Sequence, residues 1–71
     1  MKEVVLTREP VELYKILKFE GLASSGGEAK LLIDQGEVTV NGQVETQRRK
    51  KIVDGDEIEF QGELLKIQTA K

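Results

Sequence analysis

The sequence contains no cysteine, no histidine and no tryptophan. Without thiols it can form neither disulfides nor thiolate metal sites, and without imidazole it lacks the usual metal ligands and nucleophile-activating bases. Its only aromatic residues are Tyr14, Phe19 and Phe60. We therefore expect a small core of Val, Ile and Leu, no bound cofactor, and no binding mode in which bases stack on exposed sheet aromatics.

Long hydrophobic runs are also missing. No apolar stretch approaches the roughly 18 residues that a membrane-spanning helix needs, and the first six residues are too short and too acidic for a signal peptide. The sequence therefore predicts a cytoplasmic protein that does not enter a membrane. Its 71 residues predict one domain over 1–71, which buries only about 60% of the surface of the unfolded chain.

Charge is unevenly distributed along the chain. The net charge is −2, yet residues 47–53 carry four positive charges and no negative one, while residues 54–63 carry five acids and no base. One end of the domain should therefore be cationic and the other anionic.

Two short helices are predicted in the first half. Pro10 suits the first turn of a helix over 10–20, where Glu9 and Glu12 would face the positive end of the helix dipole. The spacing of the apolar residues gives this helix one buried face, formed by Leu13, Ile16 and Leu17, flanked by Tyr14. Gly21 is placed to end it in a left-handed conformation, with Leu22 folding back as in a Schellman motif.

The second helix should begin at Gly26 and end before Gly36. Ser25 and Glu28 form a capping box, in which the carboxylate returns to the backbone N–H of Ser25. The expected buried stripe is Ala29, Leu32 and Ile33, with Leu31 at its edge and Lys30 and Asp34 at best an i,i+4 pair.

Gly26 and Gly27 stand in the first turn of this second helix. Each costs roughly 1 kcal/mol relative to alanine if it is fully helical. Close helix packing or a loose helix start would explain them, and so would a phosphate that approaches bare N–H groups at the positive end of a helix. The residues alone leave both explanations open.

A sheet should follow the helices. Val38, Val40 and Val44 frame Asn41-Gly42, a strong hairpin signal. Residues 2–6 read as a short strand or an ordered arm, and residues 52–53, 57–60 and 65–67 read as further strands linked by glycine-containing turns. The predicted fold class is α+β, with a two-helix corner packed on a small, mostly antiparallel sheet.

Four consecutive cations form what we call the basic run: Arg48, Arg49, Lys50 and Lys51. In an extended segment Arg48 and Lys50 would share one face and Arg49 and Lys51 the other. Arginine offers a planar fork for phosphate oxygens and lysine a point charge, so the mixture suits a nucleic-acid backbone. A solvated loop that only aids solubility is the alternative.

Residues 13–42, LYKILKFEGLASSGGEAKLLIDQGEVTVNG, together with the basic run, resemble the S4 domain family, above all its small stand-alone bacterial members. The resemblance implies RNA binding at the helix corner, with Ser25, Gly26 and Lys30 as the best contacts beside the basic run. A second set of possible RNA contacts consists of Lys18, Gly27 and Asn41. Asn41 is also expected at this position without any ligand, because asparagine favours the backbone conformation of a hairpin turn. Many S4 sequences read Ser-Arg at the corner, so a usual cation is missing at Gly26.

Other functions fit the sequence less well. Residues 54–57, DGDE, lack the spacing of a calcium loop and read as a two-residue hairpin turn. The exposed carboxylates, serines and lysines show no catalytic spacing, so no enzyme is predicted. Residues 40–60 also look like the small sulfur-carrier proteins of ubiquitin-like fold, but the chain ends QTAK rather than in the diglycine those proteins modify.

The sequence therefore predicts a non-catalytic, monomeric protein that binds structured RNA through helix-corner amides and the basic run. Resemblance favours ribosomal RNA or a ribosome-assembly particle first and transfer RNA second. A protein–protein adaptor that uses the helix pair, with the basic run only assisting, is the alternative, and steep salt dependence would distinguish RNA binding from it.

Overall fold

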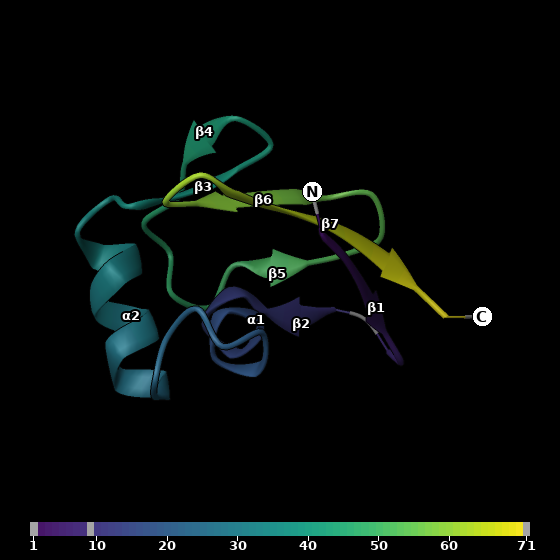
Figure 1. The fold of residues 1–71 in the computed structure, drawn as a ribbon, viewed down its shortest axis with the longest axis horizontal. Coiled ribbons are helices and arrows are strands. Elements are labelled where there is room, and N and C mark those ends of the chain that lie inside the picture. The colour runs from purple at the N-terminus through teal and green to yellow at the C-terminus, as the bar shows by residue number, and fades with distance from the viewer. Residues whose placement is uncertain (1, 9, 71) are drawn as a thin grey trace.

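The computed structural model describes residues 2–8 and 10–70. Two helices, α1 (Leu13–Phe19) and α2 (Gly26–Asp34), lie beside a five-stranded sheet of order β1-β7-β6-β3-β4 (Figure 1). The strands of this sheet are β1 (Lys2–Leu6), β3 (Val38–Val40), β4 (Gln43–Val44), β6 (Glu57–Phe60) and β7 (Glu63–Thr69). Within the described residues only the β1–β7 pair is parallel, so the predicted α+β class with a mostly antiparallel sheet is confirmed.

The sheet buries one face against the helices. In β6, Ile58 and Phe60 are buried while Glu57 and Glu59 are exposed, as expected for a strand with one side toward water. The predicted apolar face of α1 is confirmed, since each of its three members is at most 1% exposed. On α2, Ala29 and Ile33 are fully buried and Leu32 partly so. Aliphatic side chains thus make up nearly all of the core.

The first helix is shorter than the sequence suggested. Val11–Glu12 form a two-residue strand, β2, which pairs antiparallel with β5 (Lys51–Ile52), so α1 begins only at Leu13. Pro10 therefore precedes a strand and not a helix turn, Glu12 is the N-cap, and the helical position expected for Glu9 lies outside the described residues. Pairing with a segment about 40 residues away in sequence outweighs the local helix signal.

Both helices end as Schellman motifs. In α1, Gly21 has φ +77° and the N–H groups of Gly21 and Leu22 donate to the carbonyls of Lys18 and Leu17. In α2, the N–H groups of Gly36 and Glu37 donate in the same pattern. The sharp end at Gly21 turns the chain into the corner between the helices, as predicted.

The capping of α2 differs in one detail from the prediction. The Ser25 hydroxyl accepts from the N–H of Glu28 at 3.1 Å, but the Glu28 carboxylate returns to Ser24, accepting from its N–H at 3.1 Å and its hydroxyl at 2.9 Å. The Ser24 hydroxyl thus gives the Glu28 carboxylate a second donor beside the Ser24 N–H. Leu31, expected at the edge of the stripe, is 54% exposed.

The Asn41-Gly42 hairpin is confirmed, with φ values of +53° and +84° at its two turn residues. Residues 54–57 do turn, but they do not close a two-residue hairpin, because β5 and β6 belong to different sheets. The carboxylates there accept backbone N–H groups, Asp54 from Thr69 and Asp56 from Val53. No helix in the described part of the chain is long and apolar enough to span a membrane.

Candidate functional site

The basic run is fastened by its backbone to the start of α1. The N–H of Leu13 donates to the carbonyl of Lys50 at 2.9 Å, and the N–H of Tyr14 donates to the carbonyl of Arg48 at 3.2 Å. These are two of the N–H groups that a helix start leaves without an intrahelical partner. Arg48 and Arg49 occupy the centre of a turn closed by the N–H of Lys50 and the carbonyl of Gln47, so the strict alternation of sides expected for an extended run does not hold.

Tyr14 lies at the centre of the helix corner. The ammonium of Lys30, on α2, is 4.7 Å from the centroid of its ring, and that of Lys15 is 6.0 Å away. A Cβ placed on Gly26 would stand 3.7 Å from the ring edge. Since the backbone of Tyr14 also holds the basic run, this residue connects the start of α2, Lys30 and the basic run.

The start of α2 carries two amides that make no hydrogen bond to the described part of the chain. Ser25 caps Glu28, whereas the described part of the chain offers the N–H groups of Gly26 and Gly27 no hydrogen-bond acceptor. Neither glycine has a positive φ, and a Cβ at either position would meet its neighbours at ordinary contact distances. Close packing therefore does not explain these glycines, which leaves the loose helix start and the bare amides.

Two carboxylates hold arginines of the basic run. Arg48 forms a two-pronged ion pair with Asp34, the last residue of α2, with its Nε 2.8 Å from Oδ1. The hydrogen bond from the guanidinium lowers the pKa of Asp34 and raises the pKa of Arg48. The sequence allowed at best an i,i+4 pair between Lys30 and Asp34. In the structure Asp34 pairs with Arg48 instead.

Glu12 is the second carboxylate. It lies 3.2 Å from the ammonium of Lys15 and 3.9 Å from Nε of Arg49. The hydrogen bond from Lys15 is the main cause that lowers the pKa of Glu12, and the charge of Arg49 adds to it. The side chains of Arg48 and Arg49 are 54% and 70% exposed, and ion pairs at such exposed positions contribute little to stability.

Around Tyr14 the structure brings together Gly26, Lys30 and the backbone of the basic run, with Ser25 and Gly27 next to Gly26 in the chain. The Arg48 side chain lies at the other end of α2, on Asp34. Lys18 and Lys51 line a groove between α1 and β1. Asn41 lies in the β3–β4 turn, where its side chain donates to Asp56 and accepts from the N–H of Glu57.

Sequence reasoning missed three participants: Tyr14, Lys15 and Asp34. The sequence placed Tyr14 only at the flank of the apolar face. An aromatic residue next to a buried stripe, with a lysine beside it in the chain, was a signal that could have marked it as part of the site. Nothing in the sequence linked Asp34 to Arg48, since they lie on different elements.

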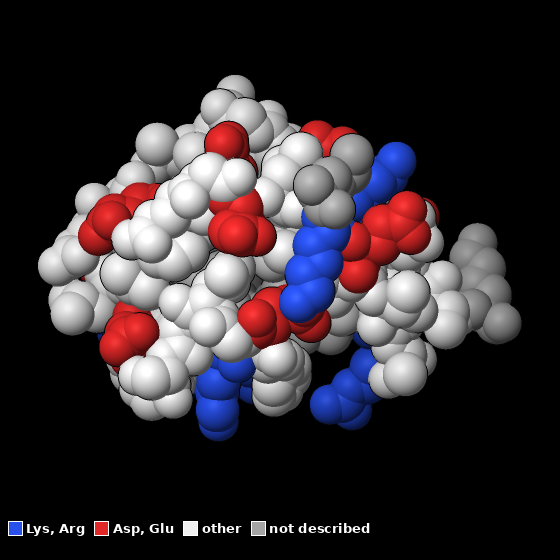
Figure 2. All heavy atoms as spheres, in the orientation of Figure 1, with Lys and Arg blue, Asp and Glu red and all other residues white. Residues whose placement is uncertain are grey.

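Charge is arranged unevenly over the surface. In Figure 2 acidic side chains are scattered over the face drawn, with basic side chains among them near its centre and upper right, and further basic side chains project at the lower edge, where α1 lies in the same orientation. The exposed acids of β6 lie on the open side of the sheet, away from the helices. Any polyanion would therefore meet less repulsion on the helix side than on the sheet side.

Comparisons with known proteins agree with this architecture. Residues 4–68 match the family model of the S4 domain. YbcJ of Escherichia coli (strain K12) is 46% identical over 57 residues, which cover 80% of this chain and 81% of that protein. RlbA of Bacillus subtilis (strain 168), named "Probable ribosome maturation protein", is 32% identical over 59 residues, covering 83% of each chain.

Among solved structures, the solution structure of Escherichia coli YbcJ superposes with a TM-score of 0.73 at 42% identity, covering 96% of this chain and 87% of that one. That structure was described as revealing an "ALFAL motif involved in RNA-binding".

Proposed function

Because this chain belongs to the S4 domain family, we propose that it is a non-catalytic RNA-binding protein, in which residues 1–71 act as one domain that holds structured RNA at the helix corner. The bare amides of Gly26 and Gly27 donate hydrogen bonds to one phosphate, and Lys30 and the basic run neutralise the neighbouring phosphates. Recognition is of backbone and shape, because an RNA double helix hides its base edges in a narrow groove.

One observation carries the proposal: separate segments of the chain place donors and cations around a single residue, Tyr14. Its ring lies 3.7 Å from where a Cβ on Gly26 would stand and 4.7 Å from the ammonium of Lys30, while its N–H donates to the carbonyl of Arg48 in the basic run. Along α2 the nine residues rise about 1.5 Å each, so donors and cations extend over roughly 12 Å between Gly26 and the Arg48–Asp34 pair. That length accommodates more than one phosphate of a strand.

We propose ribosomal RNA, in the ribosome or an assembly particle, as the first target and transfer RNA as the second. The name of the Bacillus subtilis relative supports the first. A target of this kind places the protein in the cytoplasm, where it acts as a monomer. A protein–protein adaptor remains the competing function, and the test below separates the two.

The test titrates the protein into a labelled structured fragment of ribosomal RNA at several salt concentrations, beside transfer RNA. Each neutralised phosphate contributes a log–log salt slope of about −0.7 to −0.9, so a few contacts give about −2 to −4. The first variant carries Arg49→Gln, Lys50→Gln and Lys51→Gln, which leaves the Arg48–Asp34 pair and the backbone hydrogen bonds of the basic run in place. We expect it to bind more weakly and with a shallower slope.

A matched pair of single substitutions controls for net charge. Lys30→Gln removes a cation over the Tyr14 ring, and Lys66→Gln removes one from β7 on the opposite side of the sheet. The first should weaken binding and the second should not. If wild type and both variants bind equally weakly, without a salt slope, the basic run is a solvated loop and the adaptor function replaces RNA binding.

A further inference from the structure

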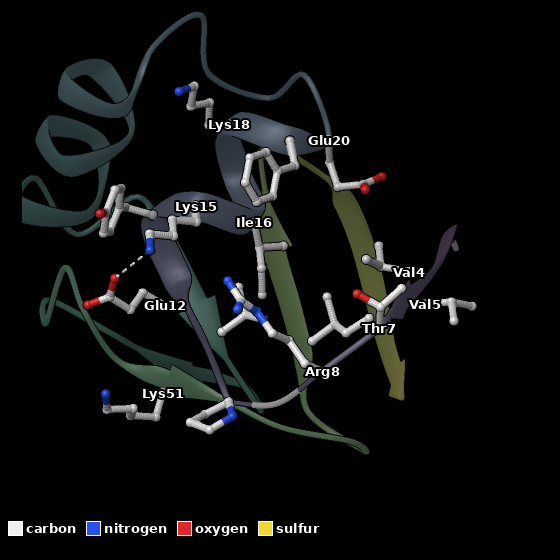
Figure 3. Close-up of a pocket in the computed structure, with 15 residues that line it drawn as sticks. Val4, Val5, Thr7, Arg8, Glu12, Lys15, Ile16, Lys18, Glu20 and Lys51 are labelled. Atoms are coloured by element: carbon white, nitrogen blue, oxygen red, sulfur yellow. Dashed lines mark ion pairs between the residues drawn. The ribbon is translucent and has the colours of Figure 1, made fainter. Parts of the chain in front are cut away.

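A groove runs between β1 and α1, next to the corner (Figure 3). Its volume is about 1030 Å³, and we call it the β1–α1 groove. Apolar side chains form part of its lining, among them Val4 of β1, Val11 of β2 and Ile16 of α1. Pockets for small organic ligands have roughly 300–1,000 Å³, so the groove has room for a nucleotide.

Phe19 also lines this groove, and it is the most unusual exposed side chain of the protein. It is the last residue of α1 and 69% of its surface is exposed, although the chain has only three aromatic residues. The other two are largely removed from water, since Phe60 is 5% exposed and Tyr14 packs on the core. An aromatic ring left in water next to a groove is a surface on which a base can stack.

The charge of the groove favours an anionic strand. Its lining includes four cations, on α1, β5 and the segment after β1: Arg8, Lys15, Lys18 and Lys51. Figure 3 shows Lys15 and Lys18 on one side of the groove and Arg8 and Lys51 on the other. Two carboxylates among the described lining residues already contact cations, Glu12 with Lys15 and Glu20 with Lys2 at 2.8 Å. The lining residues that the structure describes thus carry a net charge of +2, although the whole chain carries −2.

The groove is continuous with the helix corner. Tyr14 and Lys15 belong to both, and Lys51 extends the basic run into the groove. A strand that leaves a double helix held at the corner therefore meets the groove next. A double helix offers no free base face for Phe19, whereas unpaired nucleotides do.

We propose that the β1–α1 groove binds unpaired nucleotides flanking the RNA helix held at the corner, with one base stacked on Phe19 and phosphates near Lys15, Lys18 and Arg8. This inference rests on the proposed function and adds the ligand class: a junction between double-stranded and single-stranded RNA.

The test compares two RNAs, a blunt hairpin and the same hairpin with an unpaired extension, placed at the 5′ end in one RNA and at the 3′ end in another. Wild type should bind one extended RNA more tightly than the blunt one. Stacking on an aromatic residue is worth about 1–3 kcal/mol, so Phe19→Ala should reduce the ratio of extended to blunt affinity by about 5- to 150-fold. Val44→Ala, at an exposed position of β4 far from the groove lining, should keep that ratio.

A second variant reports stacking directly. Since the chain has no tryptophan, Phe19→Trp places the only indole beside the groove, and its fluorescence should be quenched by the extended hairpin and not by the blunt one. Circular dichroism confirms that both Phe19 variants fold.

The outcomes separate the two proposals. If wild type binds blunt and extended hairpins equally, or if Phe19→Ala keeps the preference for the extension, the groove proposal is overturned while RNA binding stands. If wild type binds none of the RNAs, both are overturned. Preference for the extension, lost in Phe19→Ala and accompanied by quenching in Phe19→Trp, supports the groove.

Discussion

Replacing Gly26 with alanine should make the protein more stable and the RNA complex weaker. Gly26 is the first residue of α2 and has no positive φ. A Cβ there would lie 3.7 and 3.8 Å from two carbons of the Tyr14 ring, which is ordinary van der Waals contact. The methyl group therefore fits without displacing the ring.

The expected gain in stability follows from the unfolded chain. Glycine loses more backbone freedom on folding than alanine, and an alanine that fits without strain stabilises by about 0.4–1 kcal/mol. For a domain of this size 1 kcal/mol shifts the melting temperature by roughly 4–8 °C, so the shift should be about 2–8 °C upward. The expected loss of affinity comes from the phosphate, which the new methyl group keeps away from the amides. Losing one hydrogen bond to a charged group costs about 1.5 kcal/mol, or roughly tenfold in affinity.

The assay is thermal unfolding by circular dichroism, followed by RNA titration of the same samples. Gly27→Ala is the companion variant, since its Cβ would meet only the Ser25 hydroxyl, at 3.9 Å. A lower melting temperature for Gly26→Ala would refute the account of open space at the helix start. A higher melting temperature with unchanged RNA affinity would show that the bare amides do not contact the phosphate, and Gly26 would then be no more than a loose helix start.

Three further predictions concern side chains around the site. Ser25→Ala removes the cap of α2 and should cost about 1 kcal/mol, measured by urea unfolding, and a cost below the error would show that Glu28 alone caps the helix. The lowered pKa of Asp34 means that its pair with Arg48 stabilises the fold above the ordinary carboxyl value of 3.8, and that this contribution is lost as the pH falls through the lower folded value. Asp34→Asn should accordingly reduce stability at neutral pH but not in strong acid, and an equal difference at both would contradict the pairing. Asn41→Ala removes two hydrogen bonds at a residue with φ +53° and should cost about 1 to 2 kcal/mol, while a loss of RNA affinity in the folded variant would make Asn41 a contact as well.

The elements with strong local signals were predictable from the sequence. Gly21 ends α1 because the backbone there takes the left-handed conformation, which glycine adopts easily. Ser25 precedes α2 because its hydroxyl accepts a hydrogen bond from an N–H group that has no acceptor within the helix. The Asn41-Gly42 hairpin follows from the same kind of short-range chemistry. Such signals depend on a few neighbouring residues, so one sequence suffices to read them.

Contacts between distant segments were not predictable in this way. The β2–β5 pair consists of two residues on each side, too few for any periodicity, and it moves the start of α1 from Pro10 to Leu13. The pairing of Arg48 with Asp34 likewise depends on where the turn after β4 crosses the end of α2. Candidate site residues were therefore identifiable by type, whereas Tyr14, which connects them, became apparent only in three dimensions.

The carbonyl groups of Arg48 and Lys50 accept hydrogen bonds from the first N–H groups of α1, and this feature can be used in protein engineering. These hydrogen bonds use only main-chain atoms, so they can form whatever side chains positions 49–51 carry. A library that varies positions 49–51 would therefore display new side chains at a constant place beside the corner, on a scaffold of 71 residues without cysteine. Selecting such a library against different RNAs would then yield variants of this loop that bind different RNA targets.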